Sequence, residues 1–247
     1  MSALSSRPFS YYFMSNTLAL LGLWIQKIGV GWLTWEITES TFWTSFVTLA
    51  LMAPAGIIGP LFAVLAEKWE MRKASIILKV LMFLVGGLIW YIQFIDKHTL
   101  FSLASLSIIQ GLLSACYHPV RLVFVSVVVP RELLASAVGL NSASFNGSRV
   151  VGPAFAGLSI ALFDLQTTFF IAVLMYMPLR ERKKSKDVNN YFDRLIAGGK
   201  VALKTPIIFK GLFIVFVSAF FVRGMLEIQP TIAGEILDSG SLGLSLI

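Results

Sequence analysis

The chain has 247 residues, of which 57% are hydrophobic and 13% charged, with a formal net charge of +7 and a mean hydropathy of +0.81. Soluble domains carry about 25% charged residues, so this composition excludes an ordinary soluble protein and predicts an all-α polytopic membrane protein. The basic residues lie in loops and form no broad surface, which argues against a nucleic-acid partner. The single cysteine, Cys116, excludes an internal disulfide.

Seven apolar segments predict seven membrane-spanning helices, because backbone polar groups in lipid must be satisfied within their own segment. The segments are 10–35, 41–66, 74–95, 99–128, 133–163, 166–179 and 207–229. The sixth has only about 14 residues, so we expect it to span with its flanks or in a locally thinned bilayer.

Lys and Arg are concentrated in alternate loops. One side of the predicted membrane holds Arg7, Lys68, Arg72, Lys73, Arg131 and the basic residues between 180 and 210. The other side holds Lys97 together with Glu36, Glu39, Asp96, Asp164, Glu235 and Asp238. The positive-inside rule therefore predicts a cytoplasmic N-terminus and a seventh span that runs outward.

The first segment carries a polar stripe. Asn16 lies eleven positions before Lys27 and returns to within about 20° of the same helix face, and Gln26 is next to Lys27. Polar residues in a span point away from lipid, so the stripe is expected either to line a central cavity or to pack against other helices.

The fourth segment groups His118 and Arg121 around Pro119, where a kink is expected because proline frees a carbonyl one turn back. His118 is interpreted either as a buried, hydrogen-bonded histidine or as a proton carrier. Cys116 and His118 are too few ligands for a zinc site, so no metal is expected.

The fifth segment contains the most unusual stretch, GLNSASFNGSRVVGPAFAG at 139–157. Its small and polar residues recur on one helix face about 80° wide, which predicts close approach of another backbone and room for a buried cation. These residues are Gly139, Ser142, Asn146, Arg149, Pro153 and Gly157. Arg149 lies near the middle of the span, and it is interpreted either as an interhelical clamp or as a group that handles substrate or protons.

Arg223 and Glu227 stand four residues apart in the seventh segment and are expected to pair on one face. Glu227 is a carboxylate well inside a predicted span, which makes it a candidate for proton coupling. The sequence contains no Gly-rich phosphate loop and no nucleophile–base–carboxylate set. We therefore expect neither an enzyme nor a cofactor.

The spacing Gly139-x8-Ser148-x3-Gly152-Pro153-x2-Ala156-Gly157 resembles the fifth-helix signature of major facilitator superfamily exporters, with Ser and Ala replacing two glycines. PVRLVFVSVVVPRELLASAVGLNSASFNGSRVVGPAFAG and WIQKIGVGWLTWEITES resemble the exporter subfamily that includes bacterial siderophore (enterobactin-type) and multidrug efflux proteins. The resemblance implies that the signature residues Gly139, Ser148, Gly152, Pro153 and Gly157 serve helix packing.

The loop AVLAEKWEMRKA resembles the superfamily's cytoplasmic gating motif, with Ala63, Glu67, Lys68, Glu70 and Met71 replacing motif residues and Arg72 kept. The resemblance implies a gating role for its charged residues. These are Glu67, Lys68, Arg72 and Lys73. The alternative is a basic topology signal without a gating role.

The resemblance also implies the domain organisation. Residues 1–179 are expected to form a six-helix N-terminal bundle of the major facilitator fold, and 180–206 a basic cytoplasmic linker. Residues 207–247 are expected to hold the first helix of a C-terminal bundle that is incomplete here, so that the fold is apparently truncated.

The implied function is that of a secondary active transporter in the plasma (bacterial inner) membrane. It is expected to export a small amphipathic, drug-like or siderophore-like compound by alternating access, coupled to protons. Two alternatives stay open. The first is a truncated chain that is inactive alone, or that needs a separate C-terminal half or a second copy of itself. The second is a non-transporting membrane scaffold or receptor.

Overall fold

The computed structural model describes residues 3–66, 70–177, 205 and 210, and the elements found there are helical. They are η1 (Ala3–Ser5), α1 (Arg7–Thr38), α2 (Thr41–Ala66), α3 (Met71–Phe94), α4 (Leu100–Val128), η2 (Arg131–Leu133), α5 (Leu134–Leu162) and α6 (Leu165–Met175). Each of the first six predicted segments overlaps one α-helix. The seventh, 207–229, lies outside the described residues.

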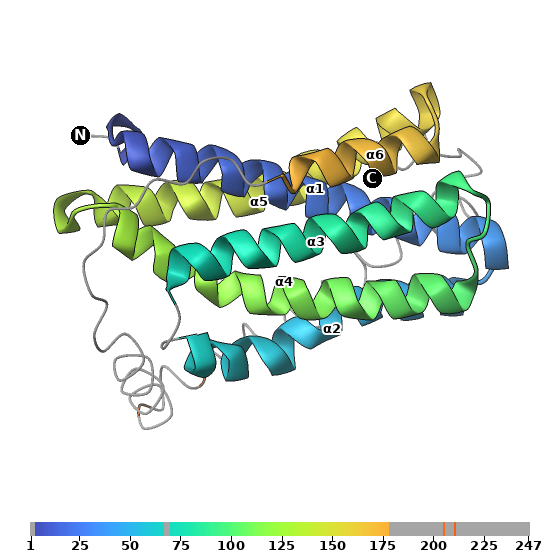
Figure 1. The fold of residues 1–247 in the computed structure, drawn as a ribbon, viewed down its shortest axis with the longest axis horizontal. Helices are drawn as coiled ribbons and strands as arrows, with labels where there is room; N and C mark the ends of the chain where they lie inside the picture. Colours follow the sequence, from blue (N-terminus) through green and yellow to red (C-terminus); the bar gives the residue numbers. More distant parts are fainter. Residues whose placement is uncertain (1–2, 67–69, 178–204, 206–209, 211–247) are drawn as a thin grey trace.

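The long helices lie lengthwise beside one another and alternate in direction (Figure 1). The chain begins at the end of the bundle where α2 ends, α3 begins and α4 connects to α5, and the α1–α2, α3–α4 and α5–α6 connections lie at the opposite end (Figure 1). Arg7, Lys73 and Arg131 therefore share one end, whereas Glu39 and Asp96 share the other. This alternation agrees with the charge pattern on which the predicted orientation depends.

Three helices are long and apolar enough to cross a membrane by length and composition, among the residues that the structure describes. They are α1, α3 and Leu100–Ser126 of α4. Helix α5 has 29 residues, but its Asn, Ser and Arg residues make it less apolar than these three. Helix α6 has 11 residues, which is about 16 Å of helix and shorter than the roughly 30 Å of a hydrocarbon core.

Helix α1 is the central helix of the bundle. Of its most apolar window, 83% is buried, against 33% for α3 and 39% for α4. It packs against α5, α6, α2 and α4. Glycine permits the closest approach to α6, because a Cβ added at Gly22 would lie only 2.7 Å from the carbonyl oxygen of Ala172.

Helices α2 and α4 run in the same direction and make a reciprocal contact between prolines and glycines (Figure 1). Pro54 cannot donate to the carbonyl of residue 50 in α2, and this carbonyl would lie 2.9 Å from a Cβ added at Gly111 of α4. Pro119 likewise frees the carbonyl of Ala115 in α4, which would lie 3.6 Å from a Cβ added at Gly59 of α2. These two carbonyls, released by Pro54 and Pro119, are thus each covered by a glycine of the partner helix.

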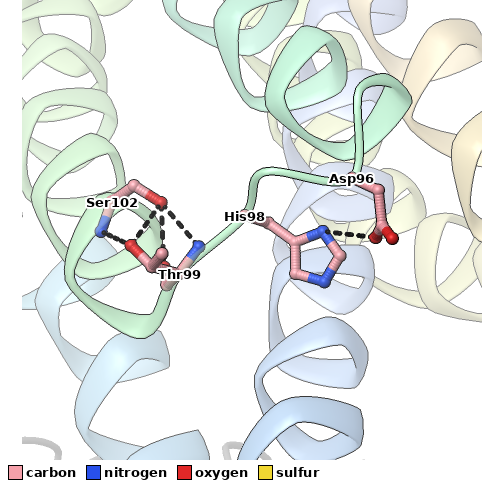
Figure 2. Close-up of polar contacts among 4 residues, drawn as sticks. All are labelled: Asp96, His98, Thr99 and Ser102. Carbon is pink, nitrogen blue, oxygen red and sulfur yellow. Dashed lines mark hydrogen bonds and ion pairs between the residues drawn. The ribbon is translucent and has the colours of Figure 1, made fainter.

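The connection between α3 and α4 is closed by short-range polar contacts (Figure 2). Asp96 has a positive φ of 53° and its carboxylate lies 3.6 Å from Nδ1 of His98. Thr99 then begins α4 with a capping box, in which its side chain accepts from the backbone N–H of Ser102 and Ser102 Oγ contacts the Thr99 N–H at 3.0 Å. These contacts fix where the chain reverses at this end of the bundle.

Candidate functional site

A hydrogen-bonded network joins three helices inside the bundle. The side-chain amide of Asn16 donates to Asn141 Oδ1 of α5 at 3.1 Å, and Asn16 Oδ1 accepts from the Tyr117 hydroxyl of α4 at 2.9 Å. Asn16 is fully buried. Beside this network, Thr17 and Ser144 join α1 to α5 through their hydroxyls at 2.7 Å. The predicted polar residue Asn16 therefore contacts side chains of two other helices.

Lys79 of α3 brings a fully buried cation to the same network. Its ammonium group donates to Ser15 Oγ at 2.9 Å and lies 5.7 Å from the centre of the Tyr117 ring. A charge in this position needs polar partners, because transfer of an unpaired ammonium group out of water is costly. Lys79 is not among the residues predicted from the sequence, although a lone lysine inside the apolar run ASIILKVLMF is a detectable signal.

Gln26, a second predicted residue of the α1 stripe, contacts α4. Its Oε1 accepts from the side-chain amide of Gln110 at 3.2 Å, and both side chains are almost completely buried. Gly86 of α3 leaves room for this pair, since a Cβ added there would lie 3.4 Å from Gln26 Oε1. Gln110 was also missed, and its signal was again one polar residue inside an apolar segment.

Aromatic and cationic side chains form a second group, which we call the Phe145 cluster: Trp24 of α1, His118 and Arg121 of α4, and Phe145 of α5. The ring of Phe145 lies 6.4 Å from that of Trp24 and 5.9 Å from that of His118, both edge-on. The Arg121 guanidinium carbon lies 4.8 Å from the centre of the Phe145 ring. Lys27 adjoins the cluster, with its ammonium group 5.0 Å from the Trp24 ring.

The structure corrects the predicted surroundings of His118. This side chain is exposed on the described bundle, so its interpretation as a buried histidine is wrong. Arg121, in contrast, is only 3% exposed. Pro119 between them lies inside a helix that continues to Val128.

The structure buries only part of the predicted face of α5, including Gly157. The buried residues of α5 are Ala137, Asn141, Ser144, Ser148, Gly152, Ala156, Gly157 and Ser159. Of the predicted face, Gly139, Ser142 and Asn146 are exposed, Arg149 is half-buried, and a Cβ added at Gly139 would meet nothing within 4 Å. The prediction favoured the face on which glycine and arginine recur, whereas the helix packs on the face where Asn and Ser find hydrogen-bond partners on α1.

Several predicted site residues lie at the ends of helices or outside the described residues. At the start of α3, Lys73 forms an ion pair with Glu70 at 3.0 Å, and Arg72 is partly buried. The other predicted residues of this loop, Glu67 and Lys68, lie outside the described residues. The same holds for Arg223 and Glu227, for the linker 180–206 apart from residue 205, and for the predicted seventh span apart from residue 210.

The predicted site residue Asn146 lies inside α5, where its side-chain amide donates to the carbonyl of Ser142 in the same helix at 2.9 Å.

Within the described residues, no group of three or more His, Cys, Asp or Glu side chains is placed to hold a metal ion. The site is therefore a set of buried amides, hydroxyls and cations between helices. Such a set can bind and orient a polar compound, but it lacks a nucleophile paired with a base.

Comparison with known proteins gives two relatives that are transporters by name. The staphyloferrin A transporter of Staphylococcus aureus (strain NCTC 8325 / PS 47) is 26% identical over 193 residues, covering 73% of this chain and 48% of that protein. The uncharacterized MFS-type transporter YfiS of Bacillus subtilis (strain 168) is 22% identical over 259 aligned positions, covering 94% of this chain and 60% of that protein. The chain thus spans about half to three fifths of the length of these relatives.

The family model described as transmembrane secretion effector matches residues 1–188, which is most of the chain and includes all six described α-helices. It is a family of membrane transporters and not of enzymes. The chain therefore belongs to the transmembrane secretion effector family of the major facilitator superfamily, and it is a multi-pass membrane protein.

Proposed function

We propose that the six described helices form the N-terminal bundle of a proton-coupled secondary transporter that exports a small amphipathic compound by alternating access. In this proposal residues 180–206 are the cytoplasmic linker and 207–247 begin the second bundle. Membership of the family supports transport. A similarity to the staphyloferrin A transporter supports a small-molecule substrate.

The observation that carries the proposal is the chain of buried polar side chains through the bundle. Lys79 on α3, Asn16 on α1, Tyr117 on α4 and Asn141 on α5 are each less than 5% exposed, and they lie in the interior of long helices. Ionisable groups inside a membrane bundle are costly and mark substrate or ion pathways. Amides and hydroxyls there also hydrogen-bond helices to one another. A merely structural bundle could pack apolar side chains in these places at lower cost.

The Phe145 cluster supports an amphipathic substrate. It places the flat rings of Phe145 and Trp24 next to the cationic side chains of Arg121 and Lys27. Rings provide apolar contact area and the cations provide directional polar contacts, which together match a compound with an apolar body and a polar end.

Two groups support coupling to protons. His118 is exposed in the middle of α4, and an imidazole can take up and release a proton. Glu227, which lies outside the described residues, is the second candidate. Inward movement of a proton would then provide the free energy for outward movement of the substrate.

Transport by inverted membrane vesicles tests the proposal. Vesicles would be prepared from cells that express the complete reading frame, and a pH gradient would be imposed across the vesicle membrane. Uptake of rhodamine 123 and carboxyfluorescein would be followed by fluorescence. We expect uptake of at least one of these dyes that nigericin abolishes by collapsing the gradient. Vesicles without the protein provide the control. Equal uptake of both dyes with and without the protein would refute the proposal.

A further inference from the structure

We infer that the Phe145 cluster binds the acidic group of the substrate, so that the exported compound is an amphipathic organic acid. This inference rests on the proposed transport function and specifies its substrate class. It is derived from hydrogen-bond donors that are buried in the cluster without an acceptor.

Arg121 is the main donor. The side chain is 3% exposed, and its Nε and Nη1 have no hydrogen-bond partner among the described residues. The guanidinium group lies over the Phe145 ring, and the Tyr12 hydroxyl holds the backbone of Arg121 by donating to its carbonyl at 2.9 Å. A guanidinium group has five donors and no acceptor, and burial without an anion is very unfavourable. The position of Arg121 therefore favours an anion with which it can pair.

Trp24 supplies a second donor beside the Phe145 ring. It is 7% exposed, and its Nε1 also lacks a partner among the described residues. Its ring meets the edge of Phe145, so that α1 and α4 each bring an unpartnered donor to one side chain of α5. An indole N–H can only donate, so the two unpartnered side chains require the same kind of ligand atom, an acceptor oxygen.

The acidic residues of the described helices cannot provide this acceptor from their own positions. They lie at or near helix ends, away from the middle of the bundle: Glu36, Glu39, Glu70, Asp96, Glu132 and Asp164. Glu36 accepts from Trp32 Nε1 at 2.6 Å, and Glu70 pairs with Lys73. Among the described residues, the buried guanidinium group of Arg121 therefore has no carboxylate on its own or a neighbouring helix turn. A substrate anion would balance this charge.

His118 connects the cluster with the surface of the described bundle. Its exposed ring lies edge-on to Phe145, whereas Arg121 is one turn further along α4 and buried. A ligand that reaches His118 therefore arrives beside Phe145 and Arg121. Its carboxylate would accept from Arg121 and Trp24, and its apolar part would lie against the rings.

Equilibrium binding to the purified full-length protein in detergent tests the inference. The probes are carboxyfluorescein, an acidic xanthene dye, and rhodamine 123, a cationic dye with the same ring system. We expect Arg121→Gln to weaken carboxyfluorescein binding by about tenfold or more, because a charge-assisted hydrogen bond is lost. Rhodamine 123 should bind the variant at least as well as it binds the wild type. Arg131→Gln, which removes an exposed arginine at the start of η2, is the matched control and should leave both affinities unchanged.

Three results would overturn the inference: no saturable carboxyfluorescein binding by the wild type up to about 1 mM, unchanged binding by Arg121→Gln, or equal losses in Arg121→Gln and Arg131→Gln. If Arg121→Gln is not obtained as a folded protein, the same binding measurement is made on Trp24→Phe. This variant keeps an aromatic ring at position 24 and removes the indole N–H. Its carboxyfluorescein affinity should fall several-fold, while Trp43→Phe on the exposed part of α2 provides the control. Unchanged affinity in Trp24→Phe would equally contradict the inference. Gradient-driven transport of rhodamine 123 without carboxyfluorescein binding would leave the proposed function intact and reject only the acidic substrate.

Discussion

Gly152 of α5 lies against the side chain of Trp24 of α1 with no space between them for a further carbon atom. A Cβ added at position 152 would be 2.5 Å from Trp24 Cβ, well inside any van der Waals contact. This contact sets the separation of α1 and α5, and with it the position of the Trp24 ring beside Phe145. The glycine of the exporter-like signature therefore determines the geometry of the candidate site.

Replacing Gly152 by leucine should destabilise the protein and disturb the site. We expect a loss of about 1–3 kcal/mol from overpacking, seen as a lower temperature of aggregation in detergent. Gly147→Leu is the matched control, because a Cβ at Gly147 of the same helix meets nothing within 4 Å. Equal loss of thermal stability in the two variants would show that α1 and α5 do not meet at Gly152.

A second glycine tests the contact between α2 and α4. A Cβ added at Gly111 would lie 2.6 Å from the Leu51 carbonyl oxygen, which belongs to rigid backbone. Gly111→Ala should therefore lower stability by about 1–2 kcal/mol, although alanine favours helix more than glycine does. In Gly87→Ala, where the nearest atom is Val173 Cγ1 at 3.9 Å, stability should stay the same or rise. A Gly111→Ala protein as stable as Gly87→Ala would contradict the close contact.

The sequence predicts the helices well because apolar length and the requirement to satisfy backbone groups in lipid decide them. The predicted segment 41–66 coincides with α2, and the fourth and fifth segments differ from α4 and α5 by no more than one residue at either end. The first segment is shorter than α1, which continues at both ends to Arg7 and Thr38. These terminal turns contain charged and polar residues, so a prediction based on hydropathy ended the segment before them.

The site could be predicted only in part, because helix periodicity gives relative angles and not the partner helix. Asn16 and Gln26 were identified from the α1 stripe, and both contact polar side chains of other helices. The packing face of α5 was predicted only in part: Gly157 is buried, whereas Gly139 is exposed. The spacing of Gly139 and Arg149 is equally consistent with an exposed face. Lys79 was missed because one lysine in an apolar run has no periodic partner on its own helix.

A double-mutant cycle between Asn16 and Asn141 tests the buried network. Each single change to alanine should lower stability, since the remaining amide is left in an apolar interior. We expect a coupling energy of about 0.5–1.5 kcal/mol between the two positions, measured by unfolding in mixed detergent. Asn146→Ala is the control, because this exposed side chain donates to Ser142 of its own helix, and it should show no coupling with Asn16. Additive losses at Asn16 and Asn141 would argue that the amides do not meet.

The orientation is testable by labelling of cysteines in intact cells with an impermeant thiol reagent. In a Cys116→Ala background, a cysteine at the exposed position Lys97 should react, because it lies on the side with few basic residues. A cysteine at the exposed position Lys73 should react only after the cells are opened. Labelling of the cysteine at 73 but not of that at 97 in intact cells would reverse the proposed topology.

The central claim is that the chain belongs to a transporter that moves its substrate with the polar residues of these helices. Arg149, half-buried in the middle of α5, tests it most directly. The measurement is gradient-driven dye uptake by proteoliposomes that contain the purified protein from the complete reading frame. We expect the wild type and the control Arg131→Met to transport, Arg149→Lys to retain part of the rate, and Arg149→Met to insert stably but to lose transport. Normal transport by Arg149→Met, or no gradient-dependent uptake by the wild type, would contradict the account.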